Sequence, residues 1–252
     1  MLKEDEILLN YIEDKKRQCE EQYMLTSTAF LDIRQLAVAE SELRYTKHLS
    51  YGGYEDAERR VVVFLPDYAD ENAPLPEEDD PLALLRVSIP KGGKKLSHRD
   101  YLGSVLSLGI DRNVTGDIIV RDDGADIIIL KSIAEYLLAN YNAAGHTHLS
   151  CEVLPVSETD LGSIKTVMKR DTVASMRLDN IVSSVFPMAR GKAQEAISSG
   201  IVFVNNIQCT KPDRQVDCGD KIVLRGKGKA IIKECGSPTK KGRTPVVFEV
   251  YI

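Results

Sequence analysis

The side chains best suited to a chemical task lie in the last third of the chain, and most of them are basic. They are Arg177, Arg190, Lys192, Gln194, Asn205, Lys211, Arg214, Lys227 and Lys229. Guanidinium and ammonium groups form charge-assisted hydrogen bonds with phosphate oxygens, and amide groups bond to phosphates, sugars and base edges. The chemistry that this set predicts is binding to a nucleic-acid backbone.

The sequence around these side chains predicts two short helices followed by strands. Apolar residues at i, i+3, i+4 and i+7 predict a helix over 177–186 with one buried face, and Pro187 ends it. A second helix follows, stops at Gly200 and carries basic residues on its outer face. Strands are predicted at 201–204 and 221–225, so the basic groups would stand on a small, rigid module.

Charge is distributed unevenly along the chain, whose formal net charge is −5. The chain has 33 Lys and Arg and 38 Asp and Glu, of which 16 and 8 respectively fall within residues 165–252. That segment therefore carries +8 and the remainder −13. A basic module on an acidic body is the asymmetry expected of a protein that meets phosphates with one part of its surface.

The basic module resembles the RNA-binding domain of the small-subunit ribosomal protein S-four, the alpha-L RNA-binding motif. The resemblance rests on RLD, ARGKAQEAI, G-I-V-x-V-N and a GDKI turn, in order and spacing between Met176 and Leu224. It implies RNA contacts by seven of the nine residues named above, and Lys227 and Lys229, which lie beyond the motif, are predicted to extend this basic surface. The alternative is that these charges form only a solvated face.

From residue 79 the predicted elements follow the order β-α-β-β-α-β, which is the ferredoxin-like arrangement. RNA-recognition modules share this order, but their central strands carry aromatic residues that stack on bases. The corresponding segments, GDIIVR and ADIIILK, contain no Phe or Tyr. A secondary RNA contact is predicted instead in the basic loop and helix start that hold Lys91, Lys94, Lys95, His98 and Arg99, because a helix N-terminus offers free N–H groups to phosphate. An ordinary surface loop and helix cap would explain the same residues.

The N-terminal part is predicted to contain helices at 3–22 and 29–43 and a strand at 60–65. The acidic, proline-rich run PDYADENAPLPEEDDPL then reads as a linker. The fold class expected is α+β in three parts: an N-terminal domain at 1–78, a ferredoxin-like domain resembling RNA-recognition motifs at 79–160, and an alpha-L RNA-binding domain at 161–252.

Several bulk features bound the class of protein. No apolar run approaches the roughly 18 residues that span a bilayer, and the acidic start MLKEDEILLN is unlike a signal peptide. The five cysteines are scattered without a CxxC pair, which favours reduced thiols over a disulfide framework or a zinc site. We expect a cytoplasmic monomer with no cofactor and no membrane contact.

Taken from end to end, the chain resembles the YlmH family of bacterial RNA-binding proteins. The resemblance is carried by FLDIRQ, SYGGYEDAERR and KLSHRDYLGSVLSLGI, followed by the basic module; Ile33 departs from the proline expected in the first segment. It implies a ribosome-associated protein that binds rRNA and tRNA on large subunits stalled with peptidyl-tRNA, in rescue or quality control. The family is also associated with cell-division gene neighbourhoods.

Enzymatic alternatives have weaker support in the sequence. The HRD at 98–100 lacks the other motifs of a kinase, and His146, His148 and Cys151 have no further ligand cluster nearby. Pseudouridine synthases carry the same basic module but need a longer catalytic domain around an Asp. An adaptor that binds a protein partner through the acidic N-terminal domain stays open. The prediction is a non-catalytic RNA-binding protein.

Overall fold

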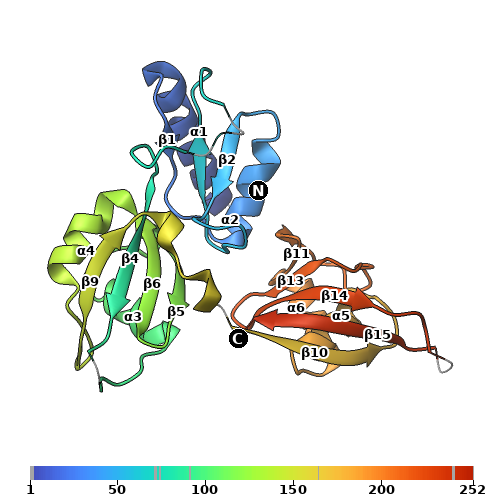
Figure 1. Cartoon of the computed structure of the whole chain (residues 1–252). Coiled ribbons are helices and arrows are strands. Elements are labelled where there is room, and N and C mark those ends of the chain that lie inside the picture. Colours follow the sequence, from blue (N-terminus) through green and yellow to red (C-terminus); the bar gives the residue numbers. More distant parts are fainter. Residues whose placement is uncertain are drawn as a thin grey trace. The chain divides into compact units, whose positions relative to one another are not determined.

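The computed structural model describes residues 3–70, 73, 75–90, 92–163, 165–239 and 242–251 (Figure 1). The chain divides into two compact units, Met1–Ser163 and Ile164–Ile252. Each unit combines helices with antiparallel sheets, so the predicted α+β class is confirmed. The separation of the first unit into domains at 1–78 and 79–160 stays a prediction.

The N-terminal part of the first unit contains α1 (Lys3–Gln22), β1 (Thr26–Ser27), α2 (Ile33–Glu42), β2 (His48–Tyr51) and β3 (Val61–Phe64). The strands form an antiparallel sheet in the order β1-β3-β2, and both helices pack against Val62 and Phe64 on one of its faces. The helix predicted from residue 29 begins at Ile33 instead. Asp32 and Gln35 form a capping box there, which satisfies N–H groups of the first turn.

The central part of the first unit contains β4 (Leu82–Ser88), α3 (His98–Leu106), β5 (Thr115–Val120), β6 (Gly124–Leu130), α4 (Ala134–Asn140) and β9 (Ser150–Leu154), with a small hairpin of β7 (Ala143–Ala144) and β8 (Thr147–His148) before β9. The four long strands are antiparallel in the order β5-β6-β4-β9. The predicted ferredoxin-like arrangement is therefore confirmed. α3 and α4 cover one face, where Tyr101 and Leu137 are fully buried.

The opposite face of the central sheet packs against the N-terminal sheet. Val61 and Val63 of β3 share an apolar cluster with Ile128 of β6, and all three are fully buried. Gly53 permits this close approach, because its φ is +90° and a Cβ there would lie 2.6 Å from a methyl of Val156. The N-terminal sheet is thus covered on one face by its own helices and on the other by the central sheet.

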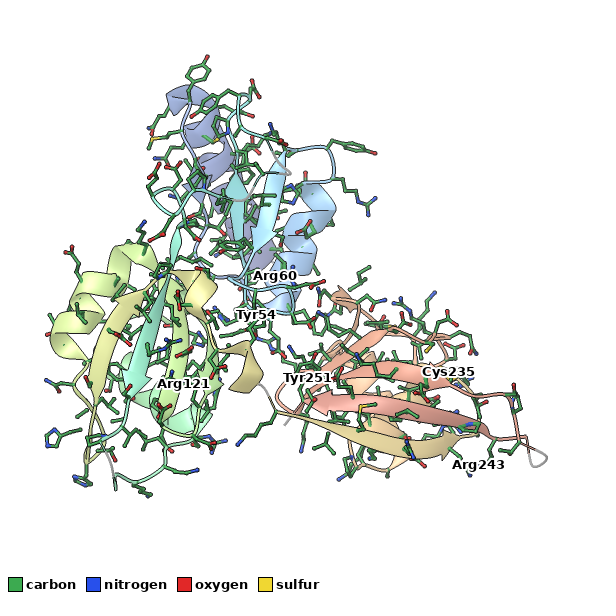
Figure 2. All side chains as sticks on the ribbon, in the orientation of Figure 1. Tyr54, Arg60, Arg121, Cys235, Arg243 and Tyr251 are labelled. Carbon is green, nitrogen blue, oxygen red and sulfur yellow. The ribbon has the colours of Figure 1, made fainter. Side chains whose placement is uncertain are left out.

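The second unit contains β10 (Thr166–Val173), α5 (Leu178–Val185), α6 (Arg190–Ser198), β11 (Val202–Val204), β12 (Ile207–Gln208), β13 (Lys221–Leu224), β14 (Gly228–Cys235) and β15 (Thr244–Tyr251). Its antiparallel sheet has the order β10-β15-β14-β13-β11-β12, and the side chains labelled Arg243 and Tyr251 mark the two ends of β15 (Figure 2). The predicted apolar stripe of α5 enters the core, which α6 also covers. The predicted turn at Asn205 and Asn206 has positive φ at both residues, 52° and 66°.

Candidate nucleic-acid interface

The basic side chains at the starts of α5 and α6 converge on one buried carboxylate. Asp179, in the first turn of α5, is 0% exposed. Arg177 donates from Nε to Oδ1 and from Nη2 to Oδ2, each at 3.2 Å. Arg190 donates from Nε and Nη2 to Oδ2 at 3.1 and 2.9 Å, and Gln194 adds a bond from Nε2 to Oδ2 at 2.8 Å. We refer to these four residues as the Asp179 cluster.

Local structure explains why these side chains meet. Arg190 and Gln194 are one helical turn apart on α6, so they project from the same face of the helix. The start of α5 is fixed from the other side, where the backbone oxygen of Arg214 accepts from the N–H of Leu178 at 2.8 Å. This bond places a further predicted RNA contact, Arg214, beside the cluster.

Within the cluster, a buried negative charge lies under two solvent-accessible positive charges. Burial by itself raises the pKa of Asp179, but hydrogen bonds from Arg177, Gln194 and Arg190 outweigh this effect, and the pKa lies well below its ordinary value. The carboxylate is therefore ionised at any physiological pH. The side chains of Arg177 and Arg190 keep 35% and 52% of their surface exposed.

Three more of the predicted contacts are exposed lysines. Lys192 lies in the first turn of α6, a helix whose start has no side-chain cap. Lys211 lies just ahead of Arg214, whose N–H donates to the Lys211 oxygen at 3.2 Å. Lys227 lies in the turn between β13 and β14. Lys192 thus lies on a helix of the Asp179 cluster, Lys211 lies on the loop that is bonded to the start of α5, and Lys227 belongs to a hairpin of the sheet.

Two predicted contacts have partners inside the second unit. The Asn205 amide donates to Asp220 at 2.7 Å and accepts from the N–H of Lys221 at 2.8 Å, so it holds two turns of the sheet together. Lys229 is buried, with its Nζ 4.3 Å from the ring centre of Tyr251. Both side chains therefore make contacts that stabilise the fold of the second unit. The sequence pattern did not reveal them, because both partners lie far along the chain.

The secondary candidate, the basic loop before α3, is exposed at its described basic residues. Lys94 and Arg99 are exposed, and Lys95 pairs with the exposed Asp122 at 3.2 Å. Lys91 lies outside the described residues. Such an exposed ion pair is weak and does not withdraw Lys95 from other anions.

The start of α3 itself is already occupied by the chain's own groups. Ser97 accepts from the N–H of Asp100, and the Asp100 carboxylate accepts from the Ser97 N–H at 2.8 Å. This capping box places a negative charge where the sequence suggested a phosphate. His98 is exposed, and the pKa of its ring is lowered by partial desolvation and then by the charge of Arg112, so it carries less positive charge than an ordinary histidine at the same pH.

The sheet face that stacks bases in RNA-recognition modules is closed here by the chain's own contacts. On this face Asp126 of β6 is 0% exposed and accepts from Arg86 of β4 at 3.0 and 2.9 Å. Arg121, labelled in Figure 2, forms a further ion pair with Asp126 at 3.4 Å. The Asp126 carboxylate also accepts from the N–H of Asp160, and Arg86 donates to the oxygen of Glu158 at 2.6 Å. The segment after β9 is therefore held across the central strands.

The SYGGYEDAERR segment is held by another aspartate of the central sheet. Asp117 of β5 accepts from the Tyr54 hydroxyl at 2.7 Å and from the N–H groups of Glu58 and Arg59 at 2.7 and 3.1 Å. Burial, followed by the charge of Asp117, raises the pKa of Tyr54 far above its ordinary value. Tyr54 therefore stays protonated as a donor to Asp117. The segment that carried part of the family resemblance thus joins the N-terminal part to the central sheet.

Three aspartates that organise these regions, Asp117, Asp126 and Asp179, were absent from the predicted site. The sequence does contain a signal for two of them. Asp126 stands in ADIIILK and Asp179 in a helix whose other inward residues are apolar. A charged residue at a position that the periodicity buries needs a charged partner, although the periodicity does not say which element supplies that partner.

Other kinds of site were sought in the described part of the chain. No group of three or more His, Cys, Asp or Glu residues able to hold a metal ion occurs there. In the same residues, no helix combines the length and apolar character required to cross a membrane.

Two family models match the chain. The one described as "Putative RNA-binding domain in YlmH" matches residues 76–158, and the S4 domain matches residues 176–222. The second match contains the entire Asp179 cluster. The first match is described as an RNA-binding domain and the S4 domain is of the alpha-L RNA-binding type, so the class of protein is RNA-binding.

A curated relative aligns with nearly the whole chain. The ribosome-associated protein quality control protein P2 of Bacillus subtilis (strain 168) is 28% identical over 255 residues, covering 98% of this chain and 95% of that protein. A solved structure, the cell division protein ylmH from Streptococcus pneumoniae, is 22% identical with a TM-score of 0.49, covering 64% of this chain and 97% of that one. The chain therefore carries a YlmH-type RNA-binding domain followed by a C-terminal S4 domain.

Proposed function

We propose that this protein is a non-catalytic, cytoplasmic RNA-binding protein that docks on the large ribosomal subunit. There it contacts rRNA and tRNA and takes part in rescue or quality control of stalled translation. The two matched domains support RNA binding. The name of the Bacillus subtilis relative supports the association with ribosomes and with quality control.

One observation carries the proposal: the accessible guanidinium groups of Arg177 and Arg190 lie side by side within the matched S4 domain. Lys192 lies on α6, and Lys211 and Arg214 lie on the loop that is bonded to the start of α5, so we expect these groups together to meet several phosphates. Guanidinium groups suit phosphate especially well, because two parallel N–H groups match two oxygens. Contacts of this kind fix the position of a protein on RNA, and shape supplies much of the selectivity.

The acidic remainder of the chain limits binding to arbitrary RNA. Residues 1–164 carry −13 and residues 165–252 carry +8. Like charge repels a polyanion over about one Debye length, roughly 8 Å at physiological salt. RNA would therefore approach the second unit through its basic face and avoid most of the first unit.

The first unit would touch RNA only outside its closed sheet face. Lys94, Lys95 and Arg99, with Lys91 beside them in sequence, remain the candidates for a secondary contact. This contact would be electrostatic and would lack base stacking, since the central strands offer no aromatic ring. We expect this secondary contact to contribute less to RNA affinity than the arginines of the Asp179 cluster.

The experiment is co-sedimentation with separated ribosomal subunits over a range of salt, followed by crosslinking to identify the RNA. Wild-type protein should migrate with large subunits, with a logarithmic affinity that falls linearly with the logarithm of salt. The double variant Arg190→Glu, Lys192→Glu should lose this association. Circular dichroism and thermal unfolding check that the variant is folded, because Arg190 also pairs with the buried Asp179.

A matched control reverses two exposed arginines of the first unit, Arg17→Glu with Arg44→Glu, and so makes the same change in net charge. It should still bind. Equal binding by both double variants would show that the α6 face is not the RNA contact. Modification of RNA by the purified protein would instead reveal an enzyme.

A further inference from the structure

We infer that Asp179 is a positioning residue for RNA recognition, which holds the guanidinium groups of Arg177 and Arg190 in one fixed arrangement for phosphate oxygens. The inference deepens the proposed function and rests on it, because it requires that this face binds RNA. It assigns to a buried acidic residue a part in binding a polyanion.

The geometry leaves each arginine one edge for Asp179 and another for a ligand. Arg177 and Arg190 both use Nε and Nη2 toward the carboxylate. A guanidinium has five N–H donors in a plane, so the edge that includes Nη1 is left for a second acceptor. Both Nη2 atoms bond to the same oxygen, Oδ2, at 3.2 and 2.9 Å. The two forks are therefore held close together with fixed orientations.

Gln194 completes the anchor from the same helix as Arg190. It donates to Oδ2 at 2.8 Å, and this bond links α6 to α5 through Asp179 whether or not RNA is bound. Free arginine side chains lose rotamer entropy when they bind a phosphate, whereas forks held in advance lose less. Asp179 would thus raise affinity without touching RNA.

A purely electrostatic view gives the opposite expectation. A carboxylate under a phosphate-binding face repels phosphate, so its removal should strengthen binding. In the positioning view its removal should weaken binding, because Arg177 and Arg190 lose their anchor. The sign of the change distinguishes the two.

The test compares Asp179→Asn with Asp213→Asn in the full-length protein. Asp213 is exposed, and its charge helps to raise the pKa of Arg177, so the two residues lie near each other. Both variants therefore remove one negative charge from the same neighbourhood. Affinity for purified large ribosomal subunits is measured by sedimentation at several salt concentrations. Circular dichroism and thermal unfolding check that each variant is folded.

We expect Asp213→Asn to bind as tightly as wild type or more tightly. Asp179→Asn should bind roughly tenfold more weakly or worse, the effect of losing about one well-placed bond to a charged group. Its salt dependence should become shallower by about 0.7 to 1.8 in log–log slope, which corresponds to one or two phosphate contacts. A folded Asp179→Asn variant that binds as well as Asp213→Asn would overturn the inference.

The outcomes also separate this inference from the proposed function. Absence of binding by wild-type protein would contradict the function itself. Binding by wild type, with loss in Arg190→Glu, Lys192→Glu but none in Asp179→Asn, would contradict only the positioning role.

If Asp179→Asn alone does not fold, Asp179→Glu asks the same question, because it keeps the negative charge and moves the carboxylate outward by one methylene. A purely electrostatic role predicts binding equal to wild type, whereas the positioning role predicts weaker binding, since Arg177 and Arg190 are displaced with the carboxylate. A folded Asp179→Glu variant that binds as tightly as wild type would overturn the inference.

Discussion

Replacing Asp126 by alanine should severely destabilise the first unit. Asp126 is 0% exposed, while the side chains of its partners Arg86 and Arg121 are only 19% and 11% exposed. The substitution leaves two nearly buried cations without this carboxylate and removes the acceptor for the N–H of Asp160. Removing one member of a buried ion pair typically costs about 3–5 kcal/mol. For a unit of this size, that corresponds to a fall of roughly 6–20 °C in its Tm.

Differential scanning calorimetry of the full-length protein measures this effect, because each of the two compact units can unfold in a transition of its own. Asp123→Ala is the matched control: Asp123 also pairs with Arg121, at 3.3 Å, but its side chain is 72% exposed. The control should cost at most about 1 kcal/mol, as exposed ion pairs do. An equal loss of stability in both variants would refute the account of Asp126 as a buried anchor.

Two further predictions concern the N-terminal part. Gly53→Ala should destabilise the unit more than Gly109→Ala, by about 1–3 kcal/mol in urea titrations. Both glycines have positive φ, but of the two only Gly53 would bring a Cβ against neighbouring side chains. Equal losses of stability would contradict the close packing of the two sheets. His48 and Glu40 bond at 3.1 Å, which raises the pKa of His48 and lowers that of Glu40. Their contribution is therefore lost as pH rises through the folded pKa of His48 and as pH falls through that of Glu40. His48→Gln should thus destabilise the protein more at pH 6 than at pH 8, as measured by chemical denaturation, and a difference that did not change with pH would contradict the pairing.

The elements were largely predictable because their signals are local. The stripe of α5, the stop at Gly200 and the β-α-β-β-α-β order follow from periodicity and turn residues within short windows. The predicted start of α2 was wrong, because the apolar residues around Phe30 extend the helical pattern toward the N-terminus. The Asp32 capping box, a local signal as well, decides the boundary.

The contacts that organise the candidate site were not predictable in the same way. Asp179 meets Arg190 and Gln194 only because α5 and α6 pack together, and Asp126 meets Arg86 only because β4 and β6 are neighbours. Periodicity places a residue on a face of its own element but does not say which element covers that face. The closed face of the central sheet is such a case, since its partners come from the N-terminal sheet and from the segment after β9.

The buried carboxylate of the Asp179 cluster has a physical explanation that the net charge of the surface does not reveal. Both Nη2 atoms bond to one oxygen, at 3.2 and 2.9 Å, so they are no more than about 6 Å apart. Two positive charges at that separation repel by roughly 1–3 kcal/mol for effective dielectric constants between 80 and 20. Without a counter-charge, the two long side chains would separate and sample many rotamers. The buried carboxylate of Asp179 offsets that repulsion on the side of the guanidinium groups that faces the protein. The N–H groups on the solvent side are left for an anion. The carboxylate lowers the net positive charge of this surface by one unit, but it fixes the spacing of the two guanidinium groups. We therefore expect the selectivity for RNA to depend on geometry more than on total charge.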